Sequence, residues 1–447
     1  MFYFITFEQL RDRTGQSIYT PTIAPSARVD GGPGGVPQIN PVMVPLLSLF
    51  PPPNLSGNYF TFPATLQDDE SYGQARVDYI LSANDAVFGR YTGDGAQRLE
   101  PMAFPEFARV GYSRMQFVTL SETHTFSPAS VGTFRLSFSK PTINVDSTST
   151  ATGPQYSLVP GQPTGNITIG GITVSNSNTT FGTDANAPNR TTRNVFSWSG
   201  DLYYTKGRHS LKYGILANHY HPESNAAGTN LRGTATFANV QSFLLGQTTT
   251  YTAPTLGSTT RRDYNFSTWG FYAQDDLRVM PRFTLNLGLR YEFSTDFTET
   301  NGRGSSLRSI RADAAFTPGL MFQNPSLKNF SPRFGFAWDV TGDGKSSVRG
   351  GFGLLYDVAD LGGSLSHVSN AQLPFSSQST IATPSVLTSL PLSFPANAIG
   401  KAVRTMDYHL QQPHMLQYNF TLERQLPSNI ALSLAYAGSR GLNLLSS

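Results

Sequence analysis

The chain has 447 residues, which is roughly two to four average soluble domains by length, or one large barrel. Charged residues make up only 14% and aromatic residues 12%, and Gly and Pro are plentiful, so the composition favours an all-β fold. The net charge of +3 is scattered, which excludes a basic nucleic-acid-binding tract, and the lack of cysteine excludes disulfides and thiolate metal sites.

No stretch of about 18 apolar residues occurs, so no transmembrane helix is predicted. The richest apolar stretch, residues 41–53, is interrupted by prolines. Residues 1–15 lack the basic start, apolar run and small-residue cleavage site of a secretory signal. A protein of this kind that lies outside the cytoplasm would therefore need an N-terminus upstream of Met1.

Along the chain, residues 1–75 are predicted to hold a first strand near positions 2–8 and then a long loop. From 76 to 447, strands are predicted in pairs joined by short turns and separated by long loops. The turns carry Gly, Pro, Asn, Asp and Ser and lie at 82–85, 127–130, 206–209, 279–282, 341–346 and 426–429. The loops, rich in Gly, Ser, Thr, Asn and Pro, lie around 141–192, 221–262, 294–328 and 358–412.

The predicted strands alternate between apolar and polar residues, as residues 283–293 (FTLNLGLRYEF) show. Successive side chains of a strand point to opposite faces, so each strand has one apolar and one polar face. Residues expected on the apolar face include Leu285, Leu287, Leu289, Phe334, Phe336, Phe420 and Leu432. Residues expected on the polar face include Asn286, Arg290, Arg349, Asn419 and Thr421.

A soluble sandwich and a transmembrane barrel both produce this alternation, and the composition of the polar face favours the barrel. That face carries Gly, Ser, Thr, Asn and Gln, whereas the solvent face of a soluble sandwich tends to collect Lys and Glu. Strands of about ten residues also fit a tilted crossing of the bilayer, with short turns on the periplasmic rim and long loops outside. Asp275 is an exception, because it falls on the apolar parity; its nearness to the turn at 279–282 would let water or lipid headgroups reach it.

An ordered series of stretches resembles one known family over nearly the whole chain. The stretches are 2–11, 75–92, 269–279 (WGFYAQDDLRV), 285–293 (LNLGLRYEF), 329–357, 416–426 (LQYNFTLERQL) and 435–445 (AYAGSRGLNLL). Together they resemble the barrel of TonB-dependent outer-membrane receptors and transporters, in the Oar-like branch.

The resemblance implies a 22-stranded antiparallel transmembrane barrel around an N-terminal plug, in the outer membrane of a Gram-negative-type bacterium. The plug and the last strands are not visible in the sequence, so the chain is expected to form a partial barrel of about 13–16 strands, open or imperfectly closed. Its first and last strands would be unpaired edges, and the chain alone would aggregate rather than insert.

The implied function is uptake of an unidentified extracellular ligand through the long loops. The implied partners are outer-membrane lipid, the TonB complex through the missing plug region, and that ligand; no nucleic acid and no cofactor are implied. The alternative is a cell-surface adhesion or binding protein on a soluble β scaffold. An enzyme is least favoured, because no nucleophile and base stand out together.

Four polar residues are candidates to face the lumen and to contact a plug or ligand: Arg290, Glu292, Arg349 and Glu423. The favoured alternative is that they pair with each other across neighbouring strands.

Residues 341–346 (TGDGKS) end like a phosphate-binding loop, but Asp339 replaces the first Gly of that motif and a strand follows, which favours a hairpin turn. His219, His221 and Glu223 could bind a metal, but a place on the extracellular rim is favoured and no metal site is predicted.

Overall fold

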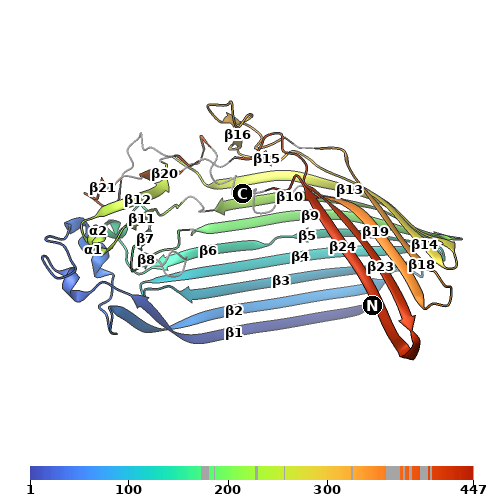
Figure 1. Cartoon of the computed structure of the whole chain (residues 1–447), viewed down its shortest axis with the longest axis horizontal. Coiled ribbons are helices and arrows are strands. Elements are labelled where there is room, and N and C mark those ends of the chain that lie inside the picture. Colours follow the sequence, from blue (N-terminus) through green and yellow to red (C-terminus); the bar gives the residue numbers. More distant parts are fainter. Residues whose placement is uncertain are drawn as a thin grey trace.

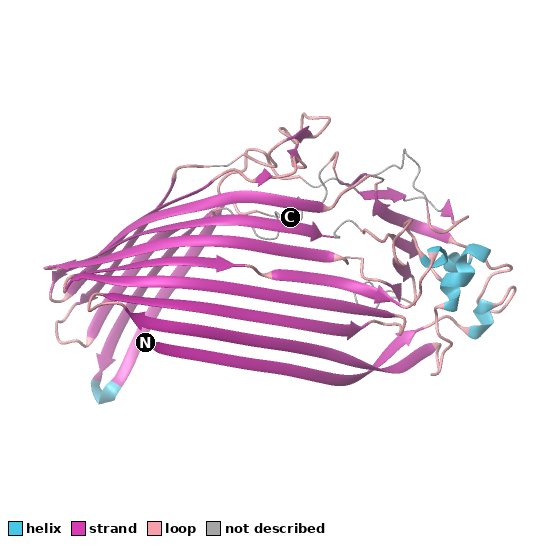
Figure 2. Ribbon diagram, turned by 180° about the vertical axis from the view of Figure 1, so that it is seen from behind, coloured by secondary structure: helices cyan, strands magenta, loops and turns pink. Residues whose placement is uncertain are grey.

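The computed structural model describes residues 1–172, 181–185, 187–226, 230–255, 257–323, 326–358, 373–375, 378–381, 385–392, 401–402 and 405–445. Within them, long antiparallel strands form one strongly curved wall, and shorter elements gather at one end of it (Figures 1 and 2). The wall consists of β1 (Phe2–Pro21), β2 (Tyr59–Ile80), β3 (Asp85–Pro101), β4 (Phe107–Ser127), β5 (Ser130–Ser139), β6 (Thr142–Ser149), β9 (Asn189–Lys206), β10 (His209–Ala226), β13 (Arg261–Met280), β14 (Phe283–Ser294), β15 (Thr298–Glu299), β18 (Asn329–Asp339), β19 (Ser346–Tyr356), β23 (His414–Leu426) and β24 (Ile430–Leu442).

The wall follows the chain order from β1 to β24, and β6 and β15 extend it beside their neighbours. Its 15 strands confirm the predicted antiparallel barrel wall of about 13–16 strands. Among the described residues β1 and β24 do not pair with each other, so the path is open, as predicted. The predicted boundary between the first loop at 1–75 and the paired strands at 76–447 is corrected, because position 75 lies inside β2. Strands β1 and β2 are both about twice as long as a membrane crossing requires.

The six predicted turns all lie at one rim of the wall, because each joins strands that pair from that end. Lys206 pairs with His209, and Leu426 pairs with Ile430, across two of these turns. The long loops leave from the opposite rim (Figure 1). The expectation that short connections occur on one rim alone is wrong in one place: residues 102–106 join β3 to β4 at the loop rim. That connection is short because Met102 and Phe104 anchor it in a buried core.

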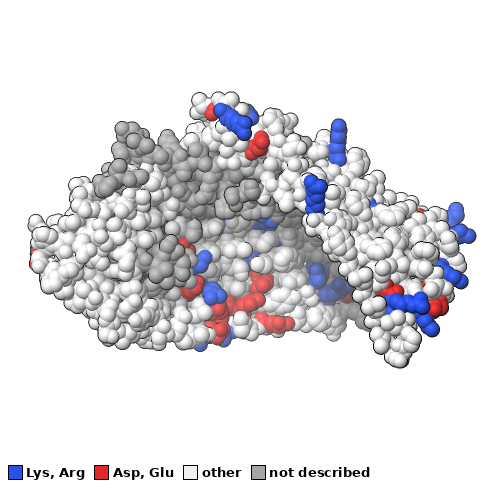
Figure 3. Space-filling model, viewed as in Figure 1, with Lys and Arg blue, Asp and Glu red and all other residues white. Residues whose placement is uncertain are grey.

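The register keeps the apolar residues of neighbouring strands on one face of the wall. Leu287 lies opposite Phe334, and Phe420 lies in the same parity on β23; their side chains are 41%, 45% and 43% exposed. The opposite parity of β2 and β3 carries charged residues such as Asp68 and Arg98, and Figure 3 shows charged side chains gathered in the hollow over these strands. The convex face is therefore apolar and the concave face polar. A soluble sandwich would bury the apolar parity, so that alternative fails.

A second region, which we call the cap, closes the loop end of the wall. It contains a small sheet, short helices and two-residue strands. The sheet is formed by β7 (Asn166–Ile169), β8 (Phe181–Gly182), β11 (Thr234–Phe237), β12 (Gln247–Pro254), β20 (Gln378–Ile381), β21 (Ser385–Val386) and β22 (Lys401–Ala402). The other elements are the α-helices α1 (Val44–Ser48) and α2 (Val240–Leu244), the 3-10 helices Pro25–Arg28, Pro41–Met43 and Pro154–Tyr156, and the strand pair β16 (Ser305–Ser306) and β17 (Thr317–Pro318); a 3-10 turn at Pro427–Asn429 lies at the other rim.

The cap has its own hydrophobic core, supplied by loops that are far apart in the sequence. Phe50, Phe104, Phe181 and Phe243 meet there, with Phe50 and Phe181 stacked at 4.0 Å between ring centroids. The proline-interrupted stretch 41–53 forms α1 and supplies part of this core. None of the described helices is long and apolar enough to cross a membrane.

A smaller apolar cluster ties the loop after β14 to the wall. It consists of Tyr264, Phe266, Phe297, Met321, Phe322 and Met406. Phe266 stacks on Phe297 at 4.1 Å and on Tyr220 of β10 at 4.6 Å. This packing holds part of the loop 294–328 against the concave parity of β13. Most of the predicted loop 358–412 lies outside the described residues.

Candidate functional site

The four predicted lumen residues all lie on the concave parity of the wall, as two ion pairs. Arg290 and Glu292 are two residues apart on β14, and their Nη2 and Oε1 atoms are 2.6 Å apart. Arg349 of β19 and Glu423 of β23 meet across strands at 3.2 Å. Arg349 and Glu423 thus pair across neighbouring strands, as the favoured alternative expected. Arg290 and Glu292 also pair with each other, but along one strand. Contact with a plug or ligand stays a prediction.

A larger polar cluster lies on the same face and was not predicted. Lys212 of β10 lies between two tyrosine rings, with its Nζ 5.0 Å from the centroid of Tyr203 and 5.3 Å from that of Tyr272. Tyr272 donates a hydrogen bond to Asp201, which also pairs with Arg135 at 3.2 Å.

Gly214 leaves the space for this cluster, because a Cβ there would lie 2.3 Å from the Tyr272 ring. The sequence signal was available: Lys212 and Asp201 are charged residues on a parity whose nearest members along each strand, Ser199, Ser210 and Gly214 among them, carry no charge. What periodicity could not show is that four different strands bring these residues together.

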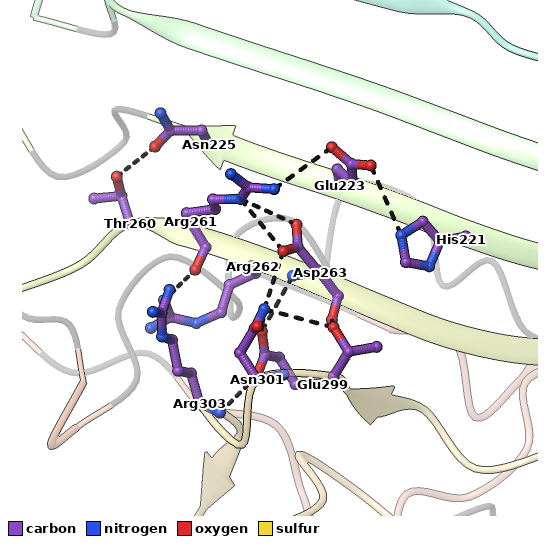
Figure 4. Close-up of polar contacts among 11 residues, drawn as sticks. His221, Glu223, Asn225, Thr260, Arg261, Arg262, Asp263, Glu299, Asn301 and Arg303 are labelled. Atoms are coloured by element: carbon purple, nitrogen blue, oxygen red, sulfur yellow. Dashed lines mark hydrogen bonds and ion pairs between the residues drawn. The ribbon is translucent and has the colours of Figure 1, made fainter.

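Polar residues at the loop rim join the wall to the loop after β14 (Figure 4). Asp263 of β13 accepts hydrogen bonds from Asn301 at 3.0 Å and from Arg261 at 3.3 Å. Glu299 accepts the backbone N–H of Asp263 at 3.1 Å and that of Asn301 at 3.0 Å. Glu299 is only 9% exposed, so it acts as an anchor for the loop rather than as a free charge.

The histidines of this rim have hydrogen-bond partners of their own. His219 Nδ1 lies 3.0 Å from the Ser267 hydroxyl, and His221 Nδ1 lies 2.5 Å from Oδ1 of Asn265. The other ring nitrogen of His221 is 3.7 Å from Glu223 (Figure 4). Among the described residues, the one group that could offer a cation three ligand atoms within 4.8 Å of one another is elsewhere, at Asp85, Glu122 and His124 near the turn rim. His124 already pairs with Asp85 at 2.5 Å.

Asp275, the predicted exception on the apolar face, lies beside a turn. Its carboxylate is 2.7 Å from Nδ1 of His209, which belongs to the neighbouring turn at 206–209. A partner at the end of the wall therefore balances this carboxylate. Residues 341–346 form a hairpin turn, as predicted, with Gly342 and Gly344 at φ of 75° and 73°.

Asp339 accepts the backbone N–H groups of Gly342 and Gly344 at 2.8 and 3.1 Å. The Thr341 hydroxyl and the Lys345 backbone N–H, in that order, hold the pKa of Asp343 below its ordinary range. The carboxylates of Asp339 and Asp343 therefore stabilise the turn itself.

A polar pocket of about 460 Å³ lies at the loop ends of β18, β19, β23 and β24. It is lined chiefly by amide, imidazole and phenol groups, including Gln323, Asn329, Tyr356, His409, Gln412 and His414. Its volume falls within the range of small-molecule sites.

Asn329 carries an unsatisfied buried polar atom at this pocket. Its side chain is 1% exposed, and its Nδ2 donates to the Ser326 carbonyl at 3.0 Å. Its Oδ1 is buried without a hydrogen-bond donor. Because a buried acceptor without a donor is unfavourable, a ligand N–H or O–H at this position would be stabilised.

The geometry described so far agrees with the comparison against known families. A model of the outer membrane beta barrel domain matches residues 1–447. The chain belongs to this family. It is a protein of the Gram-negative outer membrane, as the resemblance of its sequence implied.

Two solved structures are among those similar to this chain. The outer membrane transporter YddB from Escherichia coli superposes with a TM-score of 0.53 at 10% identity, over 97% of this chain and 44% of its own. The ferric-catecholate import receptor Fiu from the same species gives a TM-score of 0.46 at 11% identity, over 83% of this chain and 51% of its own. The chain thus spans less than half the length of YddB. No curated protein matches it.

Proposed function

We propose that this chain forms the wall and cap of a TonB-dependent receptor that binds a scarce extracellular ligand and imports it. The observation that carries the proposal is the division of the wall into an apolar convex face and a polar concave face. The apolar face fits lipid, and the polar face lines a passage that would be filled by a plug. The fold likeness to an outer-membrane transporter supports this assignment.

Ligand binding in this proposal takes place at the loop rim, in the pocket around Asn329. The anchored loop 294–328 holds one side of the pocket in place, because Phe322 packs in the cluster with Met406 and the backbone N–H of Gln323 donates to the Tyr408 carbonyl at 2.9 Å. TonB would act through a plug region outside this chain. No catalytic role is proposed for any residue.

The test uses the full-length protein in its own host. Solutes depleted from a complex medium are profiled by mass spectrometry for the wild type, a strain lacking the gene, and the wild type with its proton-motive force collapsed. We expect at least one solute to be depleted by the wild type alone. Equal depletion by the strain lacking the gene would refute transport, and depletion that survives loss of the proton-motive force would indicate a passive pore.

Two variants then locate the binding site. Asn329→Ala should slow the depletion of that solute, because it removes the buried acceptor from the pocket. Asn144→Ala on β6, which lies outside the pocket, should leave depletion unchanged. Equal rates for both variants at equal amounts of protein in the outer membrane would place the ligand elsewhere. The loop 358–412 gives a coarser test: its deletion should reduce uptake and leave membrane insertion intact.

A further inference from the structure

The convex face of β1–β4 changes from apolar to polar about halfway along the strands. One row of paired residues, Ile5, Ala75, Tyr91 and Val118, is apolar or aromatic. The next row toward the cap is Phe7, Gly73, Gly93 and Gln116, and the one after it is Gln9, Ser71, Gly95 and Arg114. The change marks the outer edge of the lipid-facing belt, because only the first of these rows suits hydrocarbon.

A groove of about 580 Å³ lies on the convex face at this edge. Gly93 and Gly95 form its floor, and the sheet surface is open at Gly95, where a Cβ would meet no atom nearer than 3.9 Å. At Gly93 the Tyr91 side chain covers the strand, with its hydroxyl 3.2 Å from the position that a Cβ would take. Tyr91 and Tyr112, each 46% exposed, border it. Asp94 also borders it, but alternation along β3 assigns its side chain to the concave face.

Two arginines flank this groove. Arg11 is held by hydrogen bonds to the Glu70 carbonyl at 2.6 Å and the Ser71 hydroxyl at 3.1 Å, and it lies 3.6 Å from Asp69. Asp69 is also paired with Arg13, at 2.7 Å. Arg114 is exposed and makes no hydrogen bond or ion pair with any described residue.

The local charge is positive. Around the groove, the convex parity of β1–β4 carries three arginines, at 11, 13 and 114, against the carboxylate of Asp69. On the neighbouring strand β6, the convex carboxylate of Asp146 is paired with Arg232 at 2.6 Å. A guanidinium binds phosphate with paired hydrogen bonds, and such groups just outside a lipid-facing belt lie at the depth of lipid headgroups. Tyrosines at the same edge are the usual residues of that interface.

We propose that this groove binds the phosphorylated sugar headgroup of the outer-leaflet glycolipid, with Arg11 and Arg114 contacting its phosphates. Gly95 allows a sugar ring to approach the strand backbone beside the Tyr91 side chain, and the acyl chains continue along the apolar rows below. This site is separate from the ligand pocket, because it lies on the opposite face of the wall from the passage.

The experiment uses the full-length protein, purified in detergent and freed of bound lipid. Native mass spectrometry measures its binding of diphosphorylated lipid A and of the same lipid after removal of both phosphates. We expect wild type to prefer the diphosphorylated lipid, and Arg11→Glu with Arg114→Glu to bind it about tenfold more weakly, as expected for the loss of charge-assisted hydrogen bonds at a partly exposed site.

The matched control is Arg98→Glu, on β3 beside Gln97 but on the concave parity. It should bind lipid A as the wild type does. Arg11→Gln with Arg114→Gln supplies a second measurement if charge reversal prevents folding. The proposal is overturned if wild type binds both lipids equally, if the folded arginine variants bind as wild type does, or if Arg98→Glu weakens binding as much as they do.

Discussion

The cap and the wall use the same apolar residue types and place them in opposite surroundings. In the cap, Phe50 is 1% exposed and Phe243 is fully buried. In the wall, Phe334 is 45% exposed and Leu432 is 58% exposed, although both lie in well-paired strands. The difference is the solvent: the cap buries its apolar groups from water, whereas the wall presents them to lipid tails.

This contrast changes what holds each region together. The cap depends on side chains from distant loops that pack against one another, as in a soluble domain. The wall depends on backbone pairing between strands, which leaves few N–H and C=O groups unpaired in hydrocarbon. A substitution should therefore act through packing in the cap and through solvation by lipid or water in the wall.

The largest expected effect is in the cap core. Phe50→Ala should destabilise the cap by about 3–5 kcal/mol, because it leaves a cavity among the three rings of Phe104, Phe181 and Phe243. Phe334→Ala in the wall should cost less, about 1.5–3 kcal/mol, since it loses the transfer of the ring from water into lipid but leaves no cavity. Hydrogen exchange of the cap amides measures the loss in Phe50→Ala, and urea unfolding in lipid vesicles measures the loss in Phe334→Ala. Equal losses for the two variants would contradict the contrast.

The second prediction concerns residues on the two faces of β14. Leu289→Arg should destabilise the protein in a bilayer by about 2–4 kcal/mol, because a charge in the middle of the lipid face must leave water and its neighbours there, Ala273 and Pro332, carry no charge. Asn286→Arg, three residues away on the concave face, should cost less than about 1 kcal/mol. Reversible unfolding in vesicles gives both values. A larger effect for Asn286→Arg would reverse the assignment of the faces.

The third prediction compares a buried anchor with an exposed ion pair. Glu299→Ala should loosen the loop 294–328 by about 1–3 kcal/mol, since it leaves backbone N–H groups without an acceptor. Glu423→Ala, whose partner Arg349 is 58% exposed, should cost at most about 1 kcal/mol. Protease cleavage within the loop reports the first effect. Unchanged cleavage in Glu299→Ala would show that apolar packing alone anchors the loop.

The smallest effect concerns pH at the connection between β3 and β4. Burial raises the pKa of Glu106, and its Oε2 has no hydrogen-bond partner. A raised folded-state pKa means that stability is greatest below the unfolded pKa and falls as pH rises through the folded one. Glu106→Gln should therefore stabilise the cap above that range and have little effect below it. Parallel pH profiles of wild type and variant would rule out this role.

Much of the wall could be predicted because its pattern is local. Residues 283–293 alternate strictly, and the structure forms β14 at Phe283–Ser294. The turns could be predicted equally well, since glycines such as Gly342 and Gly344 supply the positive φ that a tight hairpin requires. The length of β1 was underestimated, because residues beyond position 8 are polar on both parities and continue the strand above the lipid-facing belt.

The site was predicted only in part. Arg290, Glu292, Arg349 and Glu423 lie on the expected face, because parity follows from local alternation. The pocket around Asn329 and the cluster around Lys212 were missed, because each joins residues from several strands or loops. No spacing along the chain indicates which segments will meet at a loop rim.

The sequence by itself determined the alternation of the strands, the position of the turns and the polarity of each face, since these depend on neighbours within a few residues. The tertiary structure decided where the loops fold: it brought Phe50, Phe104, Phe181 and Phe243 into one core and left Asn329 with a buried, unpaired oxygen. Those outcomes depend on contacts between residues separated by up to hundreds of positions, which local periodicity does not encode.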